Sequence, residues 1–489
     1  MKVNGTRVED LAGTGLVTKQ RWVLPLWVSV PLFLARLTAR AAWLLAIWTV
    51  RAWAATIPAA LLVLVHVRVG GLGVVAAITC TLAAGLVWAY RWPDSYSRLV
   101  ARRVRGAWRW QSRYRRGWHP AMDGTGLTRT TPSRMVYVPR VTHVRSTRVV
   151  DTLYVRLLHG QTPVELAQRA EALRHVYAAH RCTVVEDGPG RVRVLFYARD
   201  PLTRIITAIT PDAVPDVAEL LVGLAEDGTS YLLTLIGRHV LVAGASGAGK
   251  GSVLWSIIRA LAPAVAAGTV RLRGVDPKGG MELYPGRALF TAYADTDLAA
   301  MVALLEAAVE DMNARKRRLK DAGLRVFVPS VADPLEVVVV DELAFLTAYA
   351  PKDIKLRVAT ALQLLLSQGR AVGFSVVAAL QDPRKDVLPF RDLFTYRIAL
   401  RLAEDSHVDM VLGDGALDRG ATCHLIPASL PGVGFVHVEG AHEPVRVRFT
   451  YLTDDDITAT ATSWPAPGNR GPGSAGGGLD VRQPEGSDR

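Results

Sequence analysis

The chain has 489 residues, of which 50% are hydrophobic, and it carries a formal net charge of +14. Its mean hydropathy of +0.20 is high for a purely soluble protein, and the length allows two or three domains. Three widely separated cysteines, Cys80, Cys182 and Cys423, exclude a disulfide framework and a zinc-ligand spacing. The excess of positive charge favours an anionic partner, either nucleic acid or a membrane surface.

Two apolar runs dominate the N-terminal third. They cover residues 52–67 and 69–90, with Arg68 between them, and the second is long enough to span a bilayer. We expect a transmembrane helical hairpin over 46–90, turning near Arg68–Gly71 and preceded by a cytoplasmic or interfacial segment, 1–45. A buried hairpin in a soluble protein is the alternative. Arginines flank the pair on both sides, so we expect both ends in the cytoplasm and a multi-pass protein of the cytoplasmic membrane.

Residues 91–140 form a basic segment in which arginines alternate with tryptophan and tyrosine. We interpret it as a juxtamembrane linker held on anionic lipid, in preference to a segment that binds DNA phosphates. Residues 141–200 then predict a small α+β domain. Its pattern is a strand over 149–157, a helix over 163–180, and a hairpin of 182–185 with 192–197.

A glycine-rich turn follows the apolar run that begins at Val240, and a helical pattern starts at Val253. Such a turn aims backbone N–H groups at phosphates, its lysine reaches the β- and γ-phosphates, and the helix adds its positive end. The position after the lysine normally carries a hydroxyl for Mg2+, but here it is glycine and a serine comes next. The predicted ATP-binding residues are Gly244, Ala245, Ser246, Gly247, Ala248, Gly249, Lys250, Gly251 and Ser252.

Strands and helices alternate from about residue 201, which predicts an α/β fold with a parallel sheet. Ligands bind beyond the carboxyl ends of such strands. The run 335–340 ends in Asp341 and Glu342, and the run 374–380 ends in Gln381. We expect Asp341, with Ser252, to hold Mg2+. Glu342 would activate the attacking water, and Gln381 would sense the γ-phosphate.

Several basic residues have two readings. On the predicted strand 396–402, Arg397 or Arg401 would reach a neighbouring subunit's nucleotide or make ordinary ion pairs, and Arg370 is a third candidate. Asp276 and Lys278 either line the site or form a simple turn. The basic helix 310–320 either follows a phosphate backbone or is a solvated face. Residues 451–489 predict a disordered tail.

Five motifs in order resemble the FtsK/SpoIIIE family of membrane-anchored DNA translocases, most closely its actinobacterial conjugative-transfer members. They are Gly-Ala-Ser-Gly-Ala-Gly-Lys (244–250), Val-Asp-Pro-Lys-Gly-Gly (275–280), Val-Val-Val-Val-Asp-Glu (337–342), Gln-Gly-Arg-Ala-Val-Gly (368–373) and Ala-Ala-Leu-Gln (378–381). The resemblance implies a RecA-like P-loop NTPase motor over 201–450 that uses ATP and Mg2+. It also implies a homo-hexameric ring around double-stranded DNA, in which Lys250, Asp341, Glu342 and Gln381 act in cis and an arginine, such as Arg397, acts in trans.

We therefore expect an ATPase that moves duplex DNA at the cytoplasmic membrane, in conjugation of a mobile element or in chromosome segregation. A winged-helix module for reading DNA is not evident after Thr450, so a separate DNA-loading protein is a further expected partner. One alternative is a type VII-like protein-secretion ATPase, which a peptide rather than DNA would stimulate. Another is a non-hydrolysing nucleotide-gated scaffold, suggested by Gly251.

Overall fold

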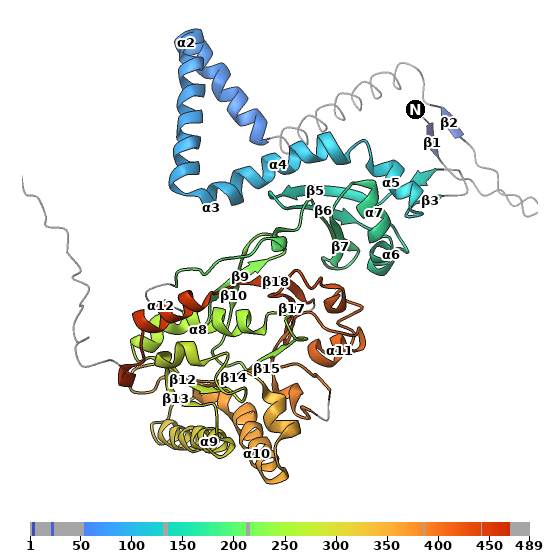
Figure 1. Ribbon diagram of the computed structural model, residues 1–489. Coiled ribbons are helices and arrows are strands. Elements are labelled where there is room, and N and C mark those ends of the chain that lie inside the picture. The colour runs from blue at the N-terminus through green and yellow to red at the C-terminus, as the bar shows by residue number, and fades with distance from the viewer. Residues whose placement is uncertain are drawn as a thin grey trace, which may run out of the picture. The chain divides into compact units, whose positions relative to one another are not determined.

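The computed structural model describes residues 2–4, 21–23, 53–130, 135–211, 216–384, 387–441 and 443–469 (Figure 1). The chain divides into two units, Met1–Val104 and Arg105–Arg489. Most of the expected N-terminal segment 1–45 and the last twenty residues of the expected tail, 470–489, lie outside the described residues.

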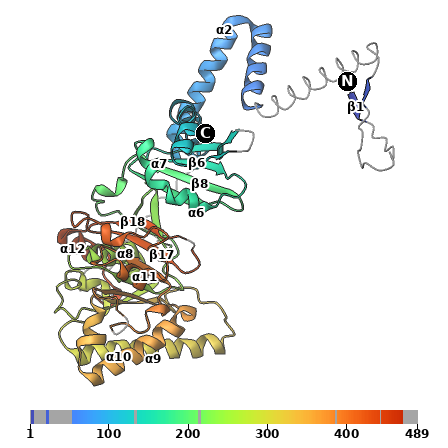
Figure 2. The same ribbon diagram turned by 90° about the vertical axis from the view of Figure 1, so that its right-hand side faces the viewer.

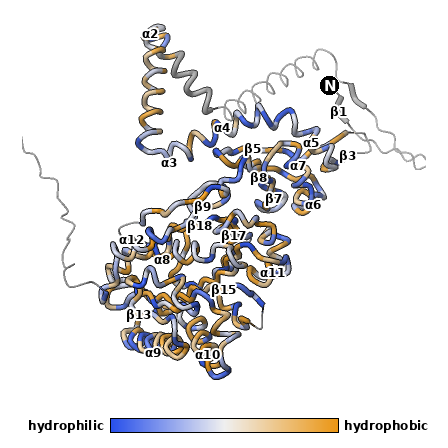
Figure 3. Tube along the Cα trace, in the orientation of Figure 1, coloured by the Kyte–Doolittle hydropathy of each residue, from blue (hydrophilic) through white to orange (hydrophobic). Residues whose placement is uncertain are grey.

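The first unit contains a long helix that is broken at Gly70. Helix α2 (Trp53–Arg91) has φ 78° and ψ −173° at this glycine, so two helical arms meet there (Figure 1). The arm His66–Arg91 has a mean hydropathy of 2.0. Among the described residues it is the one segment long and apolar enough to cross a membrane. Figure 3 shows that few of its residues are hydrophilic. The expected second span is therefore not shown. Part of it, residues 46–52, lies outside the described residues.

The remaining elements of this unit are short. They are the antiparallel pair β1 (Lys2–Asn4) and β2 (Arg21–Val23), helix α3 (Pro93–Tyr96) and the π-helical turn η1 (Ser97–Ala101).

A small α+β domain begins the second unit. Its antiparallel sheet has the order β5-β6-β8-β7, one strand more than the sequence pattern indicated. The expected helix 163–180 is two helices, interrupted at Arg169. The elements are α4 (Arg102–Arg109), η2 (Trp110–Tyr114), α5 (Trp118–Gly124), β3 (Arg129–Thr130), β4 (Val136–Tyr137), β5 (Arg140–Ser146), β6 (Val150–Arg156), α6 (Pro163–Gln168), α7 (Ala170–Val176), β7 (Arg181–Glu186) and β8 (Arg191–Tyr197).

Part of the expected basic linker contributes to the core of this domain. Tyr114 and Trp118 are buried against the sheet, and their polar atoms are paired. The hydroxyl of Tyr114 donates to Oδ2 of Asp151 at 2.8 Å, and Nε1 of Trp118 donates to the carbonyl of Pro139 at 2.7 Å. These two rings are therefore unavailable for an aromatic belt at a lipid surface, whereas Trp92 and Trp108 are exposed.

The region expected to be a motor, residues 201–450 and called the motor below, is built on a ten-stranded mixed sheet of order β10-β9-β18-β17-β16-β11-β15-β14-β12-β13. From β16 to β13 all neighbours are parallel, as the alternating pattern predicted, and from β16 to β10 all are antiparallel. The strands are β9 (Leu220–Ala225), β10 (Ser230–Leu233), β11 (Val240–Ala243), β12 (Val270–Val275), β13 (Phe290–Ala294), β14 (Leu335–Val340), β15 (Phe374–Leu380), β16 (Tyr396–Ala399), β17 (Val433–Val438) and β18 (Val445–Phe449).

Helices cover both faces of this sheet, so the motor has two apolar cores (Figures 1 and 2). Helices α8 (Lys250–Ala266) and α12 (Asp454–Ser463) pack on one face, and α9 (Leu298–Asp321) and α10 (Lys352–Gln368) lie side by side on the other. Shorter helical elements are η3 (Pro201–Thr203), η4 (Tyr284–Leu289), η5 (Phe345–Tyr349), η6 (Gly369–Val372), η7 (Arg391–Leu393), α11 (Ser406–Leu412), η8 (Cys423–Leu425) and η9 (Pro467–Asn469).

Two expectations need correction here. Helix α12 lies inside the segment assigned to a disordered tail; Thr453 caps it through a capping box, and Ile457 is buried against the motor. Within the basic run on α9, Arg315 is only 4% exposed, so it is not part of a solvated face. Its guanidinium lies between the rings of Phe327 and Phe374, 5.1 and 4.8 Å from their centroids.

Candidate nucleotide site

The phosphate-binding loop connects β11, an inner strand of the mixed sheet, to α8. Strand β11 is fully buried between β15 and β16, and α8 begins at Lys250. Two features require a glycine at position 249. Its φ is +92°, and a Cβ there would lie 2.3 Å from the backbone nitrogen of Gly432. That nitrogen donates to the carbonyl of Ala248 at 2.9 Å, which ties the loop to the start of β17.

The lysine of this loop is 8% exposed and lies over the turn. Its Nζ donates to the carbonyl oxygens of Gly244, at 2.9 Å, and Ala245, at 3.4 Å. Burial lowers the pKa of Lys250, and the negative charge of Glu342 opposes that shift. The ammonium group thus occupies a position from which it can exchange backbone oxygens for phosphate oxygens.

The predicted acids and glutamine meet at the same edge of the sheet as this loop. Strands β14 and β15 are parallel neighbours, and the backbone N–H of Gln381 donates to Oε1 of Glu342 at 3.2 Å. The N–H of Gly244 in turn donates to the carbonyl of Leu380 at 3.2 Å. The structure therefore brings Lys250, Asp341, Glu342 and Gln381 together, as the strand ends predicted; their individual roles stay predictions.

The loop after β12 supplies a second wall of the site. Nζ of Lys278 lies 2.9 Å from Oδ2 of Asp341 and 3.4 Å from Oε2 of Glu342. Burial raises the pKa of Asp341, and the Lys278 ammonium opposes that rise. Of the two readings of this segment, the structure favours the one in which Lys278 lines the site.

Glu282, on the same loop, was missed in the sequence. Its carboxylate lies against the first turn of α8, where burial and the charge of Asp341 raise its pKa to about 7. A cue existed, because a glycine stood in the hydroxyl position of the phosphate-binding loop. The sequence alone did not indicate which side chain fills the space that this glycine leaves.

The donor set suits Mg2+ only when a nucleotide is bound with it. Within the described ranges, no three or more His, Cys, Asp and Glu side chains are grouped to hold a metal. Mg2+ is commonly held by one or two carboxylates together with phosphate oxygens, and Asp341 and Glu342 meet that requirement. The predicted ligand Ser252 faces the loop before β17 instead: its Oγ would lie 3.6 Å from a Cβ placed on Gly432.

The three candidate arginines are dispersed. Nη2 of Arg401 donates to the carbonyl of Ser246 at 2.8 Å, in the phosphate-binding loop of its own chain. Arg397 bonds the carbonyl of Phe394, and Arg370 bonds that of Gly237. Strand β16 ends at Ala399, so the alternation expected through residue 402 does not continue. A role for Arg397 toward a neighbouring subunit stays a prediction.

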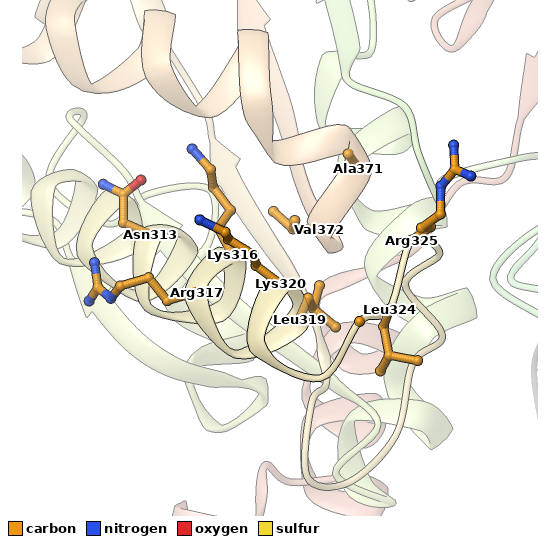
Figure 4. Close-up of a pocket in the computed structure, with 10 residues that line it drawn as sticks. Asn313, Lys316, Arg317, Leu319, Lys320, Leu324, Arg325, Ala371 and Val372 are labelled. Atoms are coloured by element: carbon orange, nitrogen blue, oxygen red, sulfur yellow. The ribbon is translucent and has the colours of Figure 1, made fainter.

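A basic groove with a volume of 760 Å3 lies at the C-terminal end of α9 (Figure 4). The charged side chains that line it are Lys316, Arg317, Lys320 and Arg325. Leu324 and Val372 add apolar surface between these charges. The solvated part of the predicted basic helix therefore faces a concave surface.

Comparison with known proteins divides the chain into two matched regions. Residues 225–425 match the model described as the FtsK/SpoIIIE family, and residues 87–197 match the actinomycete conjugal transfer protein N-terminal domain. The second match begins before the small α+β domain and ends with its last strand, so it includes the helices that bury Tyr114 and Trp118.

Two curated relatives illustrate the range of similarity. Transfer protein TraSA of Streptomyces ambofaciens is 29% identical over 337 residues, 63% of this chain and 80% of that protein. DNA translocase FtsK of Tropheryma whipplei is 29% identical over 276 residues, 52% of this chain, but the chain spans only 35% of that protein. Among solved structures, the pCW3 conjugation coupling protein TcpA has 17% identity and a TM-score of 0.49, with 71% of this chain and 98% of that chain covered.

Proposed function

Since this chain carries an ATPase domain of the FtsK/SpoIIIE family, we propose that it is a membrane-anchored motor that moves double-stranded DNA during conjugative transfer. The observation that carries the proposal is the pairing, in one chain, of that ATPase domain with the N-terminal domain of an actinomycete conjugal transfer protein. Similarity to TraSA over 80% of its length supports transfer over chromosome segregation.

The chemistry that this motor requires can be assigned to named side chains. The loop from Gly244 to Ser252 binds the phosphates, Lys250 neutralises their charge, and Glu342 orients the attacking water. Bound Mg2+ would neutralise the phosphate oxygens, and Asp341 would be the side chain that holds it. The hydrogen bond from the backbone N–H of Gln381 to Oε1 of Glu342 connects the γ-phosphate region to the end of β15, which provides a route from nucleotide state to the rest of the sheet.

DNA is the proposed substrate because the charge that the motor exposes suits a phosphate backbone. The basic groove at the end of α9 presents four cationic side chains around a concave surface (Figure 4). Cations that neutralise DNA phosphates release counterions, so binding there should weaken steeply with salt. Subunits would assemble as a homo-hexameric ring with duplex DNA at its centre.

The arm His66–Arg91 would anchor the motor in the cytoplasmic membrane, with the first arm of α2 as a second span. Arginines follow Tyr90 closely, and positive residues stay on the cytoplasmic side of a span. The motor domain would then lie in the cytoplasm, where ATP and DNA are both present. A separate DNA-loading protein would direct the ring to its starting sequence.

The test is ATP hydrolysis by the purified full chain, with and without linear duplex DNA, at low and high salt. We expect stimulation by DNA at low salt that high salt abolishes, and no hydrolysis by Glu342→Gln, which should still bind ATP. A hydrolysis rate that DNA leaves unchanged in an assembled ring would contradict the proposal. If a secretion-signal peptide then stimulated hydrolysis, the chain would instead be a protein-secretion ATPase.

A further inference from the structure

Gly251 faces a carboxylate. A Cβ placed on this glycine would lie 2.1 Å from Oε1 of Glu282 and 2.8 Å from its Cδ. A side chain at position 251 and the present position of the Glu282 carboxylate therefore exclude each other. In phosphate-binding loops of the usual pattern, that position carries the hydroxyl that binds Mg2+. Here the carboxylate oxygens of Glu282 occupy the space that this side chain would take.

The loop that carries Glu282 is fixed on both sides. Asp276 is fully buried, and its Oδ2 accepts the backbone N–H groups of Glu282, at 3.0 Å, and Leu283, at 2.9 Å. Nε1 of Trp255, on α8, donates to the backbone carbonyl of Glu282 at 3.2 Å. The backbone of Glu282 is thus held against the first turns of α8, which presents its side chain at the nucleotide edge of the sheet.

Ser252 does not share this place. Successive residues of an α-helix point about 100° apart, since a turn contains about 3.6 residues. Gly251 faces Glu282, whereas Ser252 faces Gly432, which belongs to the loop before β17. Moving the missing hydroxyl one residue along the helix therefore does not restore it to the same position.

The site also contains an oxygen that lacks a hydrogen-bond partner. Glu342 is 7% exposed, and its Oε2 accepts no hydrogen bond; the Nζ of Lys278 is 3.4 Å away. A buried carboxylate oxygen without such a bond is costly, and a bound ion or water molecule at this edge of the sheet is one explanation that fits it. This observation is independent of the contact between Gly251 and Glu282, and it points to the same edge of the sheet.

We propose that Glu282 takes the role of the hydroxyl that is missing at position 251. Together with Asp341, its carboxylate supplies a protein oxygen for the Mg2+ of bound ATP. The carboxylate coordinates the metal or one of its water molecules. This inference rests on the ATPase activity but does not depend on DNA as the substrate. It predicts that the metal affinity of the nucleotide complex depends on Glu282 and that a serine at position 251 can replace it.

The test measures metal binding directly. Full-length protein is saturated with ATPγS, and its affinity for Mn2+, used in place of Mg2+, is followed by electron paramagnetic resonance. Glu282→Gln should weaken Mn2+ binding by about 10–100-fold, the range found when groups around a metal site are removed. ATPγS binding in EDTA should change little. Glu310→Gln, an exposed glutamate on α9, is the matched control and should leave Mn2+ affinity unchanged.

The decisive variant is the double substitution Gly251→Ser with Glu282→Ala. The alanine clears the space and the serine returns a hydroxyl, so Mn2+ affinity should recover to near the wild-type value. A loss in Glu282→Gln without recovery in the double variant would show a structural role and overturn the proposal. So would wild-type affinity in Glu282→Gln, or a loss carried by Ser252→Ala instead. Failure of the wild-type protein to bind Mn2+ with ATPγS would contradict the ATPase assignment itself.

Discussion

Replacing Glu336 by leucine is expected to destabilise the strand that carries Asp341 and Glu342. Glu336 lies on β14 and is 1% exposed. Its carboxylate is 2.9 Å from Nε of Arg273 and 3.8 Å from Nη2 of Arg315. Both arginines are more than nine-tenths buried. Each keeps a second and more exposed carboxylate, Asp311 for Arg273 and Asp333 for Arg315, but loses the buried carboxylate that the two share.

The size of the effect follows from this burial. Removing one partner of a buried ion pair costs about 3–5 kcal/mol, because the other charge remains desolvated. Glu306→Leu on α9 is the matched control. Glu306 bonds Arg357 at 2.8 and 2.6 Å, but both side chains are more than a third exposed. Exposed pairs of this kind contribute about 0–1 kcal/mol, so the control substitution should change the free energy of unfolding very little.

Amide hydrogen exchange on β14 measures the difference where it arises. A cost of 3–5 kcal/mol corresponds to about two to four decades in the exchange rate, at about 1.4 kcal/mol for each factor of ten. Glu306→Leu should change the rate by less than about one decade. If the two variants affected β14 equally, the reasoning from burial would be refuted.

Four further results are expected. Gly249→Ala should abolish ATPγS binding in an equilibrium titration, because its Cβ would meet Gly432; Gly247→Ala, with φ +70° but open space, should cost only about 1–2 kcal/mol. Thr453→Ala should cost α12 about 1 kcal/mol and speed amide exchange at Ile457; no change would mean that the helix is not capped as described. Burial lowers the pKa of His239, which accepts the N–H of Val376, to about 4. The unfolded chain therefore binds the extra proton between pH 6.5 and 4, and stability should fall by about 3 kcal/mol as the pH drops through that window. His239→Asn should flatten this part of the urea-unfolding profile. Lys320→Ala should reduce the slope of log K for DNA against log salt by about 1, whereas the exposed Arg204→Ala, outside the groove, should not.

The parallel half of the motor was predictable because its signals are local. The runs 335–340 and 374–380 are mostly apolar and are each followed by a polar residue, and the structure ends each strand at the expected residue. Since parallel strands align their carboxyl ends, Asp341, Glu342 and Gln381 had to meet near the phosphate-binding loop. These same motifs predicted the resemblance to the FtsK/SpoIIIE family, and residues 225–425 match the model of that family.

What the sequence did not reveal depends on contacts between distant segments. Tyr114 and Trp118 are buried by a sheet whose strands come later in the chain. Their local pattern of aromatic and basic residues does not reveal this packing, and it therefore favoured a segment that lies on lipid. Arg315 belongs to a charge run in the sequence, yet two aromatic rings from other segments enclose it. Helix α12 is short and polar, and its stability depends on its cap and on the motor surface beneath Ile457. The contact of Glu282 with α8 is likewise a tertiary one.

The position of Lys278 has a consequence for turnover. With its ammonium 2.9 Å from Asp341, the lysine acts as a tethered counter-ion for the carboxylates of the nucleotide site. Bound Mg2+ would have to share Asp341 with this ammonium or displace it. The lysine would therefore disfavour a metal ion that enters without the negative charge of nucleotide phosphates. After product and metal had left, the same ammonium would again pair with Asp341 and balance its charge without the uptake of a proton.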